Sequence, residues 1–256
     1  MIHDPAAFGK KVFFLNPPSV IGEVLAALSD AEFEVYTASD HLKLARYLRV
    51  NPTCIVFVNI DAGTDELAWR KWISTLKESP TCKTLRFGVV SMQSDDERRN
   101  AYLMGMGVEC GFVILKQTTA RTTEILLKTL EANEARGRRK FVRAHCPEGS
   151  AEFNCKGDLS ILRGPIMDIS SAGMMVTFAE GAAPPPGAKL KDMQLSLKSG
   201  RVILDGVVLG KQEDTGESNR LIMFAPSSLD TEKRLKLRTF IRKSLQASID
   251  QALIYV

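Results

Sequence analysis

The sequence contains few of the residues from which metal sites and disulfide frameworks are built. Its three histidines are dispersed, and none of its five cysteines belongs to a C-x-x-C pair: Cys54, Cys82, Cys110, Cys146 and Cys155. An odd number of cysteines without close spacing argues against both a disulfide framework and a zinc site. We therefore expect free thiols, no metal, no cofactor and a reducing compartment.

The chain also lacks the features of membrane proteins and of several enzyme classes. No apolar run approaches membrane-spanning length, so we expect a cytoplasmic protein without a membrane span. The sequence shows no G-x-S-x-G segment, Walker loop or Ser–His–Asp set, and we expect no enzymatic activity. The net charge of +4 is mild, so any anion site must depend on local clustering of basic residues.

Residues 1–135 predict an α/β domain. Short apolar segments, several of them without alternation, indicate strands covered on both faces at 11–16, 33–38, 54–60, 85–91 and 110–116. Each is followed by an amphipathic segment, at 20–31, 40–51, 65–79, 95–106 and 122–135. Five alternations of strand and helix are typical of a doubly wound, five-stranded parallel sheet.

Residues 136–256 follow a different pattern. Seven strand-like segments succeed one another without helices between them, at 141–146, 150–155, 159–170, 173–179, 188–197, 201–210 and 219–225. They predict an antiparallel barrel of six to seven strands, with a hairpin tip at 198–200. A helix over 227–253 closes the chain; we expect Ser228 to cap it and an apolar stripe to face the barrel: Leu237, Ile241, Leu245 and Ile249.

Basic residues crowd the junction between the two domains, in "RGRRKFVR" over 136–143. Arg139 and Arg143 are four apart at the expected start of a strand, where residues an even number apart project to the same side. Two guanidinium groups facing one way suit bidentate recognition of phosphate or of the Hoogsteen edge of guanine. A solvated linker is the alternative interpretation of such a charge cluster.

A second candidate element is "DISSAG", residues 168–173, at the end of a long apolar strand. Asp168 offers a carboxylate acceptor suited to the N1–H and N2–H edge of guanine, and Ser170 adds a small hydroxyl. Gly173 permits a tight backbone path or the close approach of a ligand. The alternative is an ordinary Asx or Ser turn between two strands.

The two elements together resemble the PilZ family. Arg139-x-x-x-Arg143 matches its R-x-x-x-R motif, and Asp168-x-Ser170-x-x-Gly173 matches its (D/N)-x-S-x-x-G motif, over a resemblance spanning roughly 136–250. The resemblance implies binding of cyclic di-GMP, a bacterial second messenger. It implies that the arginines contact phosphate and guanine, that Asp168 and Ser170 read a base edge, and that Gly173 keeps the strand entry open. Arg138, just before the motif, is implied in accommodating a stacked pair of ligand molecules.

The first domain resembles the receiver domains of response regulators, but its phosphorylation site is incomplete. Ser91 and Lys116 occupy the family's positions after the fourth and fifth strands, whereas Asn16 and Pro17 stand where an acidic pair is expected. The third strand ends in Asn59, and Asp61 follows as a loop acid. Because Mg²⁺ requires hard carboxylate oxygens, we expect a degenerate receiver that serves as an interaction or dimerisation module.

The leading hypothesis is a cyclic di-GMP receptor whose arginine arm closes over the ligand and changes domain orientation, signalling to a protein target in, for example, motility or envelope machinery. A homodimer is compatible with it. Rival hypotheses are a small-barrel nucleic-acid binder, an active phospho-responsive regulator and an adaptor that has lost its ligand. Few aromatic residues beyond Phe141 are interleaved with the basic ones, and the net charge is only slightly positive, which disfavours nucleic acid. The missing acidic pair after the first strand disfavours an active phospho-responsive regulator. The two intact PilZ-like motifs disfavour an adaptor that has lost its ligand.

Overall fold

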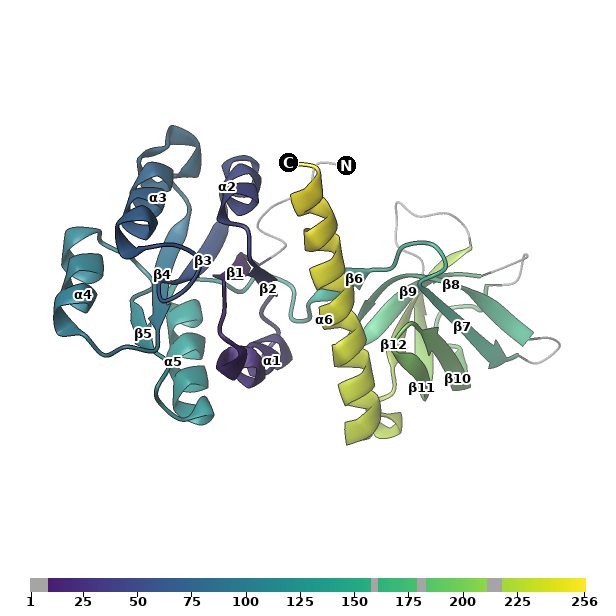
Figure 1. The fold of residues 1–256 in the computed structure, drawn as a ribbon. Helices are drawn as coiled ribbons and strands as arrows, with labels where there is room; N and C mark the ends of the chain where they lie inside the picture. Colours follow the sequence, from purple (N-terminus) through teal and green to yellow (C-terminus); the bar gives the residue numbers. More distant parts are fainter. Residues whose placement is uncertain (1–8, 158–160, 179–182, 211–217) are drawn as a thin grey trace. The chain divides into compact units, whose positions relative to one another are not determined.

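The computed structural model describes residues 9–157, 161–178, 183–210 and 218–256. Contacts divide the chain into two compact units (Figure 1): Met1–Lys140 together with Gln246–Val256, and Phe141–Leu245. In the described part of the chain, no helix combines the length and the apolar character that a membrane crossing requires.

The first unit is built on a parallel sheet of five strands. In chain order these are β1 (Lys11–Leu15), β2 (Val35–Ala38), β3 (Cys54–Asn59), β4 (Arg86–Ser91) and β5 (Phe112–Ile114). Their spatial order is β2-β1-β3-β4-β5, and every pairing is parallel. The predicted doubly wound α/β fold is confirmed.

Helices cover both faces of this sheet (Figure 1). They are α1 (Gly22–Asp30), α2 (His41–Val50), α3 (Glu66–Glu78), α4 (Asp96–Asn100) and α5 (Thr119–Ala132). Residues of α1 and α5 share one core cluster with Phe14 and Phe57 of the sheet. On the other face, Phe13 contacts Tyr47 of α2, and Phe87 contacts Trp72 of α3.

The fourth helix is shorter than the sequence predicts. A regular α-helix over 95–106 was expected, but α4 ends at Asn100 and the backbone continues as a π-helix over Ala101–Gly105. Its start is well defined because Asp95 accepts hydrogen bonds from the backbone N–H groups of Glu97 and Arg98. This cap fixes the position of Arg98 on the first turn.

The second unit is a closed antiparallel barrel. Six strands form it: β7 (Ala151–Lys156), β8 (Ile161–Ser170), β9 (Gly173–Thr177), β10 (Lys189–Leu197), β11 (Gly200–Gly210) and β12 (Asn219–Phe224). They follow the order β8-β7-β10-β11-β12-β9, and a further β8–β9 pairing closes the circle. The short strand β6 (Arg143–His145) pairs with the end of β8. The predicted barrel is confirmed, as is the hairpin at 198–200, where Leu197 pairs with Gly200.

The C-terminal helix α6 (Thr231–Ile254) is confirmed, but its cap and its contacts differ from the prediction. Asp230, not Ser228, accepts the hydrogen bond from Lys233 N–H at the helix start, because the Ser228 hydroxyl instead accepts one from Asp205 N–H. Leu237 and Ile241 belong to the barrel core, as expected. Ile249 lies in Gln246–Val256, which groups with the first unit.

Candidate ligand-binding site

The ladder between β6 and β8 brings three predicted site residues onto one face. Arg143 pairs with Ser170, and His145 pairs with Asp168. Between them, Ala144 and Ile169 are fully buried in the barrel core. Because side chains alternate along a strand, Arg143, Asp168 and Ser170 all point away from the core, although Ser170 is buried there at 6% exposure.

Arg143 and Asp168 form an ion pair on this face. Arg143 Nη1 lies 3.7 Å from Asp168 Oδ1, with side-chain exposures of 34% and 31%. An ion pair with this much solvent contact adds little to stability, so it can be exchanged for contacts with an anionic ligand at low cost. The structure therefore places together the cation and the carboxylate that the sequence motifs predict.

Ser170 organises the turn between β8 and β9. Its hydroxyl accepts hydrogen bonds from Ala172 N–H (3.3 Å) and Gly173 N–H (3.2 Å), and donates one to the Gly173 carbonyl (3.1 Å). A hydroxyl has one donor and two acceptor sites, so these three bonds use its full capacity. In this conformation Ser170 acts as an ordinary Ser turn, the alternative that the sequence left open. Its hydroxyl holds the turn beside Asp168.

Gly173 is required by the packing of β9 on β12. A Cβ added to Gly173 would lie 2.4 Å from the Ile222 carbonyl oxygen and 3.3 Å from Met223 Cα. Distances this short exclude any side chain unless the strands separate. The tight backbone path expected at Gly173 is therefore present, and it results from the close packing of β9 on β12.

Arg138 and Arg139 lie ahead of this ladder. Both are exposed, in the irregular segment that precedes β6. Because the strand begins only at Arg143, the alternation expected to align Arg139 with Arg143 does not extend to Arg139. By contacts, both residues group with the first unit and Arg143 with the second.

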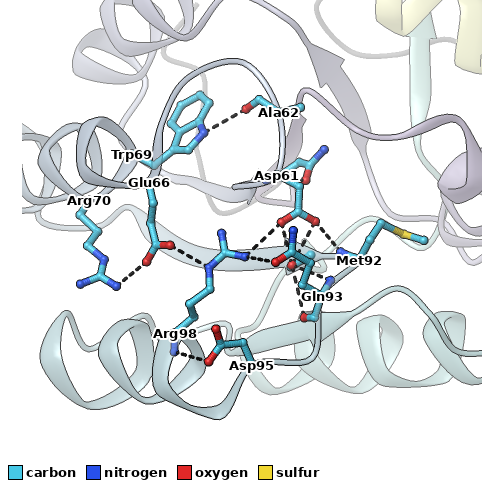
Figure 2. Close-up of polar contacts among 11 residues, drawn as sticks. Asp61, Ala62, Glu66, Trp69, Arg70, Met92, Gln93, Asp95 and Arg98 are labelled. Carbon is cyan, nitrogen blue, oxygen red and sulfur yellow. Dashed lines mark hydrogen bonds and ion pairs between the residues drawn. The ribbon is translucent and has the colours of Figure 1, made fainter.

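The receiver-like unit has its own cluster of polar residues at the carboxyl ends of β3 and β4. Figure 2 shows Asp61 at its centre. The Asp61 carboxylate accepts hydrogen bonds from Ser91 Oγ (2.9 Å) and from Met92 N–H (2.6 Å). Asn59, where receivers carry the phosphorylated acid, donates from Nδ2 to the Asn16 carbonyl at 2.8 Å. Asp61 is thus more than a neighbouring loop acid, because it holds the β4–α4 connection.

Arg98 completes this cluster and was missed by sequence reasoning. The charged residues at 95–99 are typical of a solvated helix start, yet the Arg98 side chain is only 17% exposed. Its Nη1 lies 3.5 Å from Asp61 Oδ1, and its Nε donates to Glu66 Oε2 at 2.7 Å (Figure 2). Lys116, the receiver-like lysine, is exposed. Nothing in the local sequence distinguishes Arg98 from its neighbour Arg99.

By topology and motifs together, the chain joins a receiver-like unit to a PilZ-like barrel. No family model and no curated protein matches it. Several solved structures are similar in part. The PilZ domain of YcgR from Escherichia coli, with c-di-GMP, shares 18% identity over 45% of this chain and 97% of that domain, at a TM-score of 0.38.

Two further structures are similar to one part of the chain each. The MrkH–c-di-GMP complex of K. pneumonia shares 17% identity, covering 46% of this chain and 57% of MrkH, with a TM-score of 0.38. The chemotaxis response regulator CheY4 of Vibrio cholerae shares 17% identity, covering 49% of this chain and 98% of CheY4, with a TM-score of 0.40. The chain thus spans little more than half of MrkH. At these identities, the functional assignment rests on the residues themselves.

Proposed function

We propose that this protein is a non-catalytic receptor for cyclic di-GMP. The observation that carries the proposal is the convergence of Arg143 and Asp168 on the outer face of the barrel, beside the turn that Ser170 holds. These are the residues at which the two motifs resemble those of PilZ domains. The barrel supplies a rigid floor on which a cation and an acceptor are fixed one strand apart.

The chemistry of the pair suits a guanine nucleotide with phosphate groups. The Arg143 guanidinium offers parallel N–H donors to a phosphate or to guanine O6 and N7. The Asp168 carboxylate accepts from the N1–H and N2–H edge of guanine. On binding, Arg143 and Asp168 each exchange their contact with the other for a contact with a ligand group, so neither charge is left without compensation.

The arginines ahead of β6 extend this proposal to the way in which ligand binding is signalled to another protein. In it, the arm that carries Arg138 and Arg139 closes over the ligand, with Arg139 contacting phosphate, and ordering of the segment changes the orientation of whatever precedes it. A protein target then recognises the changed domain orientation. The exposure of both arginines and the irregular backbone of their segment are consistent with such an arm.

Calorimetric titration of the full-length protein with cyclic di-GMP and with GTP tests the proposal. We expect selective binding of cyclic di-GMP, weakened about tenfold to a hundredfold in Arg143→Ala and in Asp168→Ala, because each loses charge-assisted hydrogen bonds worth roughly 1.5–3 kcal/mol. Arg163→Ala is the matched control: Arg163 is exposed on the same strand, β8, but pairs with Asn154 of β7. Equal binding of GTP or of single-stranded RNA would contradict the proposal.

A further inference from the structure

The outer face of the barrel continues from the candidate site onto β12. Ser170 and Gly173 face each other across the β8–β9 turn, Gly173 pairs with Met223 of β12, and Met223 pairs with Val207 of β11. Paired residues of antiparallel strands project to the same face. These four residues therefore form one cross-strand row that begins beside Arg143, the partner of Ser170.

Met223 is the first side chain in this row beyond the turn. Its neighbours Ile222 and Phe224 are 0% and 2% exposed in the barrel core, whereas Met223 is 47% exposed. Gly173, between Ser170 and Met223, contributes no side chain, and its backbone lies close against β12. No side chain therefore stands between Ser170 and the flexible apolar side chain of Met223 in this row.

We propose that Met223 is a specificity residue of the candidate site, forming the apolar wall against which a purine base of the ligand packs. The inference rests on the proposed function. Met223 lies on β12, two strands from Asp168, and two residues along β12 from Leu221, which stands opposite Asp168 through Met175 of β9; the separation is about 10 Å across the strands and about 7 Å along them. A purine together with the two side chains fills such a span. The thioether of methionine is polarizable and packs favourably on aromatic rings.

Substitutions at Met223 test this role in the full-length protein, with cyclic di-GMP affinity measured by calorimetry. We expect Met223→Ala to weaken binding about three- to tenfold and Met223→Leu to stay within about threefold of the wild type, because leucine keeps an apolar wall. Met223→Glu is expected to weaken binding more than Met223→Ala, since it adds a negative charge near the phosphates. A cyclic dinucleotide with pyrimidine bases should lose less affinity than cyclic di-GMP on Met223→Ala.

Ile203 provides matched controls. It is 45% exposed on the outer face of β11, but it lies four residues from Val207, about 13 Å along the strand, and pairs with Gln194. Ile203→Ala and Ile203→Glu should leave affinity unchanged. If Arg143→Ala abolishes binding while every Met223 variant binds like the wild type, this inference is overturned and the proposed function stands. If the wild type does not bind cyclic di-GMP at all, both are overturned.

Discussion

Arg98 lies against two carboxylates of the receiver-like unit, with its Nη1 3.5 Å from Asp61 Oδ1 and its Nε 2.7 Å from Glu66 Oε2. Asp61 is also hydrogen-bonded by Ser91 and Met92. The one acid that follows β3 closely is therefore neutralised and held by the protein's own groups. A guanidinium supplies here the positive charge that a metal ion supplies in a phosphorylatable site.

From this arrangement we predict that Asp61 is not phosphorylated by acetyl phosphate in the presence of Mg²⁺. The metal requires carboxylate oxygens, and Asn16 and Asn59 offer amide and backbone groups that already bond to each other. Intact-mass spectrometry before and after incubation is the measurement. A gain of one phosphoryl group in the wild type that is missing from Asp61→Asn would show that the site is active.

We also predict that Arg98→Ala destabilises the protein by about 1–3 kcal/mol, because it leaves two largely enclosed carboxylates without their shared cation. Thermal unfolding followed by circular dichroism measures the change. Arg99→Ala is the control, since Arg99 is 49% exposed and its ion pair is with the exposed Asp96. Equal melting temperatures for the two variants would refute a structural role for Arg98.

Gly173→Ala is expected to destabilise the protein by about 1–3 kcal/mol, because the new methyl group overlaps the Ile222 carbonyl oxygen at 2.4 Å. Chemical denaturation of the full chain measures it. Gly22→Ala is the matched substitution: Gly22 begins α1 with helical angles, and a Cβ there meets nothing within 4 Å. We expect that variant to be neutral or slightly more stable. If the Gly173→Ala protein were as stable as Gly22→Ala, β12 would have shifted to accommodate the methyl group at little cost in free energy.

The buried thiols predict a loss of stability at alkaline pH. Burial raises the pKa of Cys54, Cys110 and Cys146 to about 12 from the usual 9.0, and for Cys146 the Asp168 carboxylate adds to the shift. The folded chain keeps these protons after the unfolded chain has lost them. Their stabilising contribution is therefore complete below about pH 9 and is lost as pH rises from 9 toward 12.

The measurement is the melting temperature at a series of pH values from 8 to about 10.5. We expect it to fall above pH 9, and to fall less steeply in Cys146→Ala, whatever the melting temperature of that variant at pH 8. All five cysteines are buried, so alkylating reagents should modify the folded protein slowly at pH 8. Rapid modification of the native thiols would contradict this interpretation of their environment.

The sequence alone determined both folds and most element boundaries, because these depend on local patterns. The apolar run at 54–60 became β3, all of whose residues are buried. The motif residues of the barrel were also identifiable, since their order and spacing are properties of the chain. Arg143 and Asp168 were expected to converge, and they do.

Only the tertiary structure decided which side chains meet across large separations in sequence. Arg98 and Asp61 are joined because the first turn of α4 approaches the loop after β3, and Met223 comes into line with Ser170 through the register of three strands. Register and loop approach are set by the packing of whole elements, which residue patterns near either position do not encode. For the same reason, the hydrogen bonds of the Ser170 hydroxyl depend on the folded geometry of the turn, which the residue pattern does not specify.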